Sequence, residues 1–254
     1  METIDLNSDL GESYSAWKMG DDTAMLEIVS SANIACGFHA GDPSGIYDTL
    51  QAAISKNVKI GAHISYPDKA GFGRRFIDIS SKDLFAEVIY QISALDGMAK
   101  TLNGKVSYIK PHGALYNRMA TDLEHAKVVL DALKAYNPKL KLLALANSAL
   151  INFAKNLGVD VIAEAFADRA YTSKGHLVAR NIKGALLHDV DKICARMIKL
   201  VKTGELESIE GKSIKIDASS ICVHGDSPDA VAIAKAIAVA FKHEDISIKS
   251  FITT

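Results

Sequence analysis

Four of the eight histidines in this 254-residue chain follow four separate β-prone segments. They are His39, His63, His112 and His224. In a parallel α/β fold, the carboxyl ends of the strands converge on one site. We therefore expect these imidazoles to share a site, although packing or capping explains most single histidines at a strand end.

The first β-prone segment carries an unusual number of polar side chains. Side chains alternate between the two faces of a strand, so Asp5, Asn7 and Asp9 share one face. Burial of three polar residues is unfavourable unless they are paired or bind a ligand. An exposed edge strand is the simpler explanation, but the apolar residues on the opposite face favour a polar pocket.

Aspartate and histidine on separate strands can act as acid and base, or can hold a divalent metal that activates water. We expect Asp9, Glu12 and His63 to supply acid–base chemistry. Lys110 could stabilise an oxyanion, and a buried ion pair is the competing explanation for it. If a metal is bound, we expect Asp9, His39 and His63 to hold it.

Other polar residues near the strand ends could contact a substrate. Arg74 lies in a glycine-containing loop and could bind a carboxylate through two hydrogen bonds, although a solvated loop charge is the alternative. Cys36 could be a nucleophile, but a small buried strand residue is the simpler interpretation. The expected substrate-binding residues are Asn7, His39, Arg74, His112, Asn117, Glu164, Asp168, Arg169 and His224.

Short β-prone segments alternate along the chain with longer amphipathic ones. Several are mostly apolar, as expected of parallel strands covered on both faces. We expect strands at Thr3–Asp9, Ala32–Phe38, Lys59–His63, Val106–Lys110, Leu140–Ala144, Asp160–Ala163 and Ser220–His224, with an eighth candidate at Ile246–Phe251. This order predicts βα repeats in one α/β domain, closed into a barrel or stacked as an open sheet.

Apolar residues at spacings of three and four predict helices between these strands. The spacing is clear in Lys82–Leu102 and in Val190–Leu200. Asp42-Pro43 and Ser227-Pro228 each place a capping residue before a proline, which is typical of a helix start. The segment Glu164–Leu187 has weak periodicity, so we expect a loop over one end of the sheet.

The composition argues against several classes of partner. The 29 Lys and Arg residues nearly balance the 30 Asp and Glu residues, and no long basic block interrupts them. This balance argues against nucleic acid or a membrane as the partner. Three cysteines in a long chain indicate a reducing compartment. The sequence shows no signal peptide or membrane-spanning run, so we expect a soluble, cytoplasmic protein.

Six segments resemble the LamB/YcsF family, in the same order and over nearly the whole chain. They read DLNSDLGES at 5–13, SANIACGFHAGDP at 31–43, GAHISYPDKAGFGRR at 61–75, KPHGALYN at 110–117, EAFADRAY at 164–171 and ICVHGDSPDA at 221–230. The resemblance implies a single domain, residues 1–254, with a seven-stranded β/α barrel. This barrel is similar to that of polysaccharide deacetylases and some glycoside hydrolases.

The family is described as the A subunit of prokaryotic 5-oxoprolinase. The resemblance therefore implies opening of 5-oxo-L-proline to L-glutamate, coupled to hydrolysis of ATP, with Mg²⁺, to ADP and phosphate. It also implies separate B and C subunits as partners, which fits the lack of a P-loop or GxGxxG motif in this sequence. The alternatives are a stand-alone metal-dependent deacetylase or amidohydrolase acting on a carbohydrate or lactam, and a non-catalytic carrier subunit.

Overall fold

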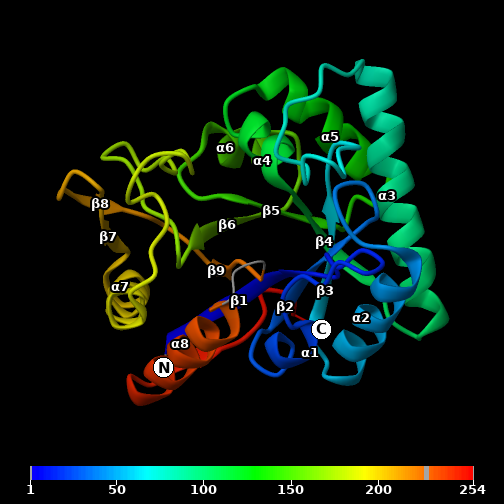
Figure 1. The fold of residues 1–254 in the computed structure, drawn as a ribbon. Coiled ribbons are helices and arrows are strands. Elements are labelled where there is room, and N and C mark those ends of the chain that lie inside the picture. Colours follow the sequence, from blue (N-terminus) through cyan, green and yellow to red (C-terminus); the bar gives the residue numbers. More distant parts are fainter. Residues whose placement is uncertain (1, 226–228, 254) are drawn as a thin grey trace.

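The computed structural model describes residues 2–225 and 229–253, and its centre is a closed barrel of parallel strands (Figure 1). The order around the barrel is β1-β2-β3-β4-β5-β6-β9, and the ring closes because β9 pairs with both β6 and β1. The strands are β1 (Glu2–Leu10), β2 (Ser31–Ala35), β3 (Lys59–Ile64), β4 (Val106–Pro111), β5 (Lys141–Leu145), β6 (Val161–Phe166) and β9 (Ser220–Val223). The predicted seven-stranded β/α barrel is confirmed, and the open sheet is excluded.

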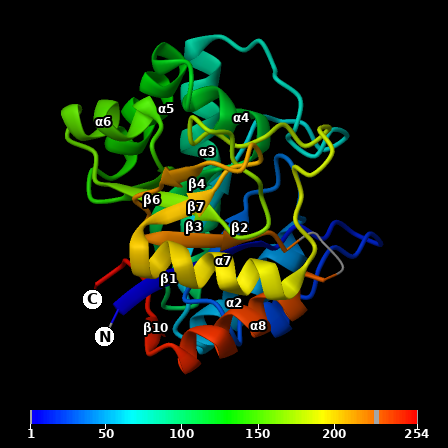
Figure 2. The ribbon, with the colours of Figure 1, turned by 90° about the vertical axis from the view of Figure 1, so that its left-hand side faces the viewer.

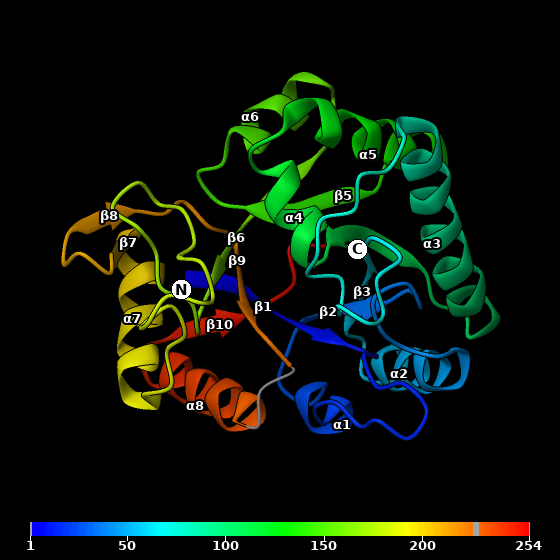
Figure 3. The same ribbon diagram turned by 45° about the horizontal axis from the view of Figure 1, so that its top comes forward.

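Helices surround the barrel on its outside (Figure 3). They are α1 (Asp22–Met25), α2 (Pro43–Ser55), α3 (Ser81–Thr101), α4 (Gly113–Met119), α5 (Leu123–Tyr136), α6 (Ala149–Asn156), α7 (Val190–Thr203) and α8 (Ala230–His243). The apolar stripe of α3 is buried, and this helix packs against α5 and β3. The two helices expected from spacing alone, α3 and α7, are therefore both present.

The expected cap of α2 is also present. The Asp42 carboxylate accepts a hydrogen bond from the Gly45 backbone N–H at 3.0 Å, and Pro43 is the first helical residue. This cap satisfies a donor that has no partner within the helix. The second expected start, Ser227-Pro228, lies outside the described residues.

Three strands end three residues away from the expected position, and the first of them is β2, which ends at Ala35 and not at Phe38. β6 continues to Phe166, so the expected loop is present but begins after Phe166 and not at Glu164, which pairs with Leu145 of β5 and with Ser220 of β9. These pairings on both sides hold the segment extended although its sequence pattern is weak. The last strand, β10 (Ile246–Ile248), is shorter than expected and pairs only with the first residues of β1, outside the closed ring.

A short hairpin was not expected from the sequence. β7 (Glu205–Glu207) and β8 (Ser213–Lys215) pair antiparallel between α7 and β9, outside the barrel. Figure 2 shows α7 and α8 side by side along the outer surface near this hairpin. Within residues 2–225 and 229–253, no helix is long and apolar enough to cross a membrane.

Gly61 in β3 offers a direct test of the packing inside the barrel. A methyl group at this position would lie 2.2 Å from the ring of Tyr108, whose hydroxyl donates a hydrogen bond to Asn33 at 2.7 Å. Because the ring would have to move, we expect Gly61→Ala to lower the free energy of unfolding by about 1–3 kcal/mol. Chemical denaturation measures this change.

Gly97→Ala is the matched control. Gly97 lies in α3, where an added methyl group would meet open space, so the same substitution should raise the stability by about 0.5–1 kcal/mol. An unchanged stability of the Gly61→Ala protein would contradict the described packing.

Candidate active site

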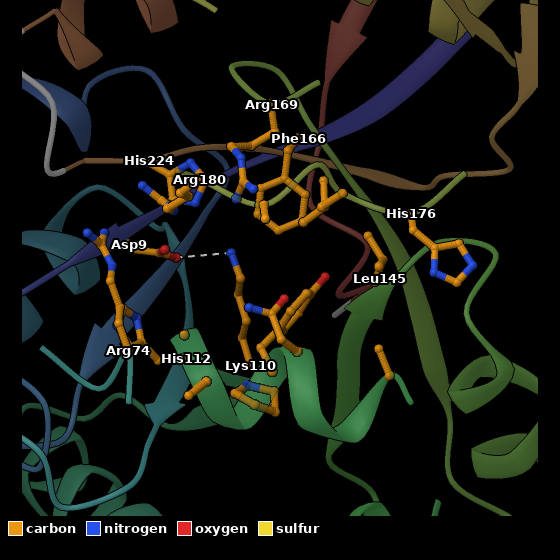
Figure 4. A pocket seen from close by; sticks show the side chains of 18 of the residues that line it. Asp9, Arg74, Lys110, His112, Leu145, Phe166, Arg169, His176, Arg180 and His224 are labelled. Atoms are coloured by element: carbon orange, nitrogen blue, oxygen red, sulfur yellow. Dashed lines mark hydrogen bonds and ion pairs between the residues drawn. The ribbon is translucent and has the colours of Figure 1, made fainter. Parts of the chain in front are cut away.

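A cavity of about 550 Å³ lies at the carboxyl ends of the barrel strands (Figure 4). Asp9, His63, Lys110 and Phe166 reach it from four strands, and His224 follows a fifth. Residues 176–181, in the loop after β6, line the cavity as well. Side chains that are far apart in the sequence thus converge on one site.

Asp5 lies deeper in the barrel, surrounded by serine hydroxyls. Ser31 and Ser30 donate to its Oδ1 at 2.6 and 2.7 Å, and Ser220 donates to its Oδ2. Burial raises the pKa of Asp5 to about 6, although the three hydroxyls oppose the rise. The polar face of β1 therefore begins with a paired carboxyl group and not with a solvent-exposed one.

Lys110 lies in the barrel interior between two carboxylates. Its Nζ is 3.0 Å from Asp9 Oδ1 and 2.9 Å from Glu164 Oε1, and it donates to Asn7 Oδ1 at 3.3 Å. Burial alone would lower the pKa of Lys110, but the negative charges around it, Asp9 first, raise the pKa well above its ordinary value. Its hydrogen bonds go to protein groups, which favours the ion-pair explanation over an oxyanion contact.

Asp9 stays ionised although it is buried. Burial alone would raise its pKa, but the charges of His63 and Lys110 hold the pKa well below its ordinary value. Oδ1 accepts hydrogen bonds from Asn33 at 2.8 Å and from Lys110 at 3.0 Å. Oδ2 lies 3.4 Å from Nε2 of His63, and Asp9 lines the cavity. Oδ2 is therefore the oxygen placed to meet a bound molecule.

Glu12 and three histidines form a buried cluster beside Asp9, and this His/Glu cluster could bind a metal. One ligand atom from each of Glu12, His39, His63 and His112 lies within 4.8 Å of the others. Nε2 of His63 is 2.9 Å from Nδ1 of His112, and Nε2 of His39 is 3.0 Å from Oε1 of Glu12. Burial lowers the pKa of both His39 and His112 well below its ordinary value. Both rings are therefore neutral, with lone pairs for a cation.

His224 forms a separate pair with Asp168. Nδ1 of His224 lies 2.9 and 2.8 Å from the two carboxylate oxygens, so it donates its proton to Asp168. Burial would raise the pKa of Asp168, but the charge of His224 lowers it below its ordinary value. One ligand atom of His224 also lies within 4.8 Å of one from Asp9. An ionised carboxylate and an oriented imidazole thus lie close together in the cavity wall.

Cationic side chains reach the cavity from the loops. Arg74, Arg169 and Arg180 line it, and Figure 4 shows all three on the side of His224 and Asp9. The neighbouring Arg75 is paired with Asp68 instead. A small anion in the cavity would therefore meet favourable charge.

A family model described as the LamB/YcsF family matches residues 4–254. The chain belongs to the LamB/YcsF family. Among curated proteins, a 5-oxoprolinase A subunit of Agrobacterium fabrum is 59% identical to it, over 99% of this chain and 98% of that protein. Among solved structures, the lactam utilization protein from Thermus thermophilus is 36% identical with a TM-score of 0.93, covering 98% of this chain and 100% of that one.

More distant structures show similarity to this chain in their fold. A family 4 carbohydrate esterase from Streptomyces lividans aligns over 99% of this chain and 93% of its own, with a TM-score of 0.50 and 10% identity. This chain and the carbohydrate esterase therefore share the barrel architecture.

The structure of this LamB/YcsF chain groups the predicted site residues by position. Glu12 and His39 belong to the buried cluster, Asn7 and Glu164 contact Lys110, and Asp168 orients His224. The predicted residues that line the cavity are Asp9, His63, Arg74, Lys110, His112, Asn117, Arg169 and His224.

Cys36 does not fit the role of a nucleophile. It is buried, and burial raises the pKa of its thiol far above the neutral range. The thiolate form that a nucleophilic cysteine needs is therefore suppressed. The simpler interpretation, a small buried residue next to a strand, agrees with the structure.

Several residues of the site in this LamB/YcsF chain were not anticipated. Tyr116 donates to Glu164 Oε2 at 2.9 Å, and Lys110 lies 3.1 Å from Cys222 Sγ. Asn33 donates to Asp9, and Arg180 lines the cavity from the loop. Three of the segments that resemble the family contain Tyr116, Cys222 and Asn33. Their position in these segments was the sequence signal that could have identified them. Their roles could not be predicted because each contacts a partner that lies far away in the sequence.

Asp5 should give the fold a characteristic pH dependence. The folded chain keeps a proton on Asp5 up to about pH 6, whereas the unfolded chain releases it near the ordinary value of 3.8. The contribution of Asp5 to stability is therefore complete below about pH 4 and falls by about 3 kcal/mol as the pH rises past 6. We expect Asp5→Asn to remove this fall. The free energy of unfolding of the wild type minus that of the variant should therefore decrease between about pH 4 and 7.

Asp48→Asn, at an exposed position of α2, is the control for the Asp5 experiment. Its stability should follow that of the wild type at each pH. A difference between Asp5→Asn and wild type that stays constant with pH would show that Asp5 has no raised pKa.

Removal of the Lys110 ammonium should destabilise the chain strongly. Lys110→Met leaves Asp9 and Glu164 as buried negative charges without their cation, so we expect a loss of about 3–5 kcal/mol in the free energy of unfolding. Lys127→Met removes a lysine from a solvent-exposed pair with Asp131 and should change stability by less than about 1 kcal/mol. Equal losses in the two variants, measured by urea denaturation, would count against the buried ion pair.

Proposed function

We propose that this chain is the A subunit of an ATP-dependent 5-oxoprolinase, which opens 5-oxo-L-proline to L-glutamate while ATP is hydrolysed to ADP and phosphate. The observation that carries the proposal is the match, over nearly the full length of both chains, to proteins named as the A subunit of 5-oxoprolinase, at 53–59% identity. The lactam utilization protein, with the same fold at 36% identity, supports a lactam as the substrate class. Separate B and C subunits are the partners in this proposal.

The cavity suits a small anionic substrate. 5-Oxo-L-proline carries one carboxylate and one ring amide, and a volume of about 550 Å³ leaves room for it. Arg74 and Arg169 are the cations we assign to the substrate carboxylate. Lys110 is not assigned to this contact, because its charge is already balanced by Asp9 and Glu164.

We assign the two proton transfers of lactam hydrolysis to Asp9 and His224. Water adds its oxygen to the carbonyl carbon, the ring C–N bond breaks, and the ring nitrogen takes up a proton to become the amine of glutamate. Oδ2 of Asp9 orients and deprotonates the water, while His63, 3.4 Å away, holds this carboxylate in its charged form. His224, oriented by Asp168, supplies the proton to the nitrogen.

ATP fits this scheme as the source of an activated lactam. An unactivated five-membered lactam is a poor electrophile, and phosphorylation of its oxygen makes it a better one. In the proposal, the B and C subunits perform this step with ATP and Mg²⁺. They pass the phosphorylated lactam directly into the cavity of this chain, where a weakly basic carboxylate such as Asp9 is then sufficient to activate water. Addition of this water and opening of the ring leave γ-glutamyl phosphate, and a second water molecule hydrolyses it to glutamate and phosphate.

Glutamate release that depends on 5-oxoproline tests the proposal. We expect negligible release by the isolated chain, and restored release when the B and C subunits, ATP and Mg²⁺ are added together. Robust release by the isolated chain without nucleotide would contradict the proposal and would favour the stand-alone hydrolase.

Substitutions in the cavity distinguish a catalytic subunit from a subunit that only carries the substrate. In the reconstituted complex, Asp9→Asn and His63→Ala should each lower turnover by about 10²–10⁴, because each disturbs the group that activates water. Circular dichroism and size-exclusion chromatography check that folding and assembly of the complex survive. His188→Asn, which changes an exposed histidine, should keep the wild-type rate. Wild-type turnover in the Asp9→Asn complex would instead indicate a carrier role.

A further inference from the structure

Hydrogen bonds to the backbone fix which ring nitrogens carry the protons in the cluster beside Asp9. Nδ1 of His63 is 2.9 Å from the carbonyl oxygen of Lys110, and Nε2 of His112 is 2.9 Å from that of Phe72. A carbonyl oxygen only accepts, so both of these nitrogens are donors. Nε2 of His63 and Nδ1 of His112 are therefore the ring nitrogens left to face the cluster, and each can offer a lone pair to a cation.

These two nitrogens face each other. They are 2.9 Å apart, a distance that one shared proton bridges, and a cation in place of that proton would be bound by both nitrogens. Oε1 of Glu12 approaches the same point, 4.0 Å from Nε2 of His63 and 3.7 Å from Nδ1 of His112. The protein thus directs two nitrogen donors and one oxygen donor toward one position.

We infer that Glu12, His63 and His112 bind one divalent transition-metal ion of the zinc class. Ligand atoms around a tetrahedral zinc ion are about 3.3 Å apart, given bond lengths near 2.0–2.1 Å. The three separations here, 2.9, 3.7 and 4.0 Å, lie on both sides of that value. Two histidines and one glutamate, with a fourth position open, form a ligand set found in catalytic zinc sites. Mg²⁺ and Ca²⁺ prefer all-oxygen ligands and fit this set poorly.

His39 is a positioning residue and not a ligand. Its ring stacks on His112 with centroids 3.9 Å apart and planes 9° apart, so the in-plane lone pairs of the two rings cannot point at one ion. Nε2 of His39 instead donates to Glu12 Oε1 at 3.0 Å and orients that carboxylate. Among the described residues, Nδ1 of His39 has no hydrogen-bond partner, which agrees with a proton on Nε2.

The surroundings of the ligands support this assignment. Histidines that bind metals commonly donate their other ring proton to a carbonyl, as His63 and His112 both do. These two residues line the cavity described above, and Glu12 and His39 line a second cavity of about 540 Å³, so an ion has a path from solvent. When bound, such an ion supplies a Lewis acid and lowers the pKa of a water molecule on it.

The test measures binding without any reaction. The full chain is treated with a chelator and titrated with Zn²⁺ by calorimetry, and the visible spectrum of added Co²⁺ reports its coordination. We expect one ion per chain. Glu12→Gln and His112→Asn should weaken binding by at least about tenfold, and His39→Asn by about 10–100-fold. Circular dichroism verifies the fold of each variant.

His188→Asn is the matched control, since it removes an exposed histidine, and it should bind as the wild type does. Absence of one-to-one binding by the wild type, or equal affinity of the wild type and Glu12→Gln, would overturn the inference. If His112→Asn fails to fold, Glu12→Gln decides, because it keeps the size and shape of the side chain. Binding of Zn²⁺ without 5-oxoprolinase activity in the reconstituted complex would count against the proposed function alone. Activity without binding of Zn²⁺ would count against the metal site alone.

Discussion

One positive charge enclosed by the barrel determines much of the arrangement around it. The Lys110 ammonium is buried between Asp9 and Glu164, and a charge removed from water is tolerated only when its partners are themselves held by hydrogen bonds. Asn33 donates to Asp9, and Tyr116 donates to Glu164. The interior is therefore a connected polar network, in which the position of each group is fixed by several others.

This network gives two aspartates of one strand opposite behaviour. Asp5 and Asp9 lie on the same face of β1, and both are buried. Three serine hydroxyls donate to Asp5, but burial outweighs them and its pKa is raised. Asp9 lies beside Lys110 and His63, whose charges outweigh burial and lower its pKa. Of the two, the aspartate near the cavity is therefore the one that stays ionised well below neutral pH, in the form that the proposed water activation requires.

The positions of these groups were largely predictable from local patterns. The period-two alternation in β1 places Asp5, Asn7 and Asp9 together, and all three contact residues of neighbouring strands inside the barrel. Histidines at strand ends were likewise enough to indicate a shared site. The barrel as such came from the family resemblance, because alternation of strands and helices fits an open sheet equally well. The partners of each group were not predictable. Asp9 meets Asn33 because the two residues face each other in the β1–β2 register, and that register is a property of the folded sheet.

Part of the cationic side of the cavity depends on α7. Arg196 in α7 donates to the carbonyl oxygens of Phe166, Ala167 and Arg169, so it anchors the start of the loop after β6. That loop carries Arg169 and Asp168, which orients the histidine of the cavity wall. The strands and the short segments after them thus supply the carboxylates and imidazoles, and the longer loops supply the arginines. Under the proposed function, a change in these loops would therefore alter which anion the cavity accepts, while the carboxylates and imidazoles of the barrel stay in place.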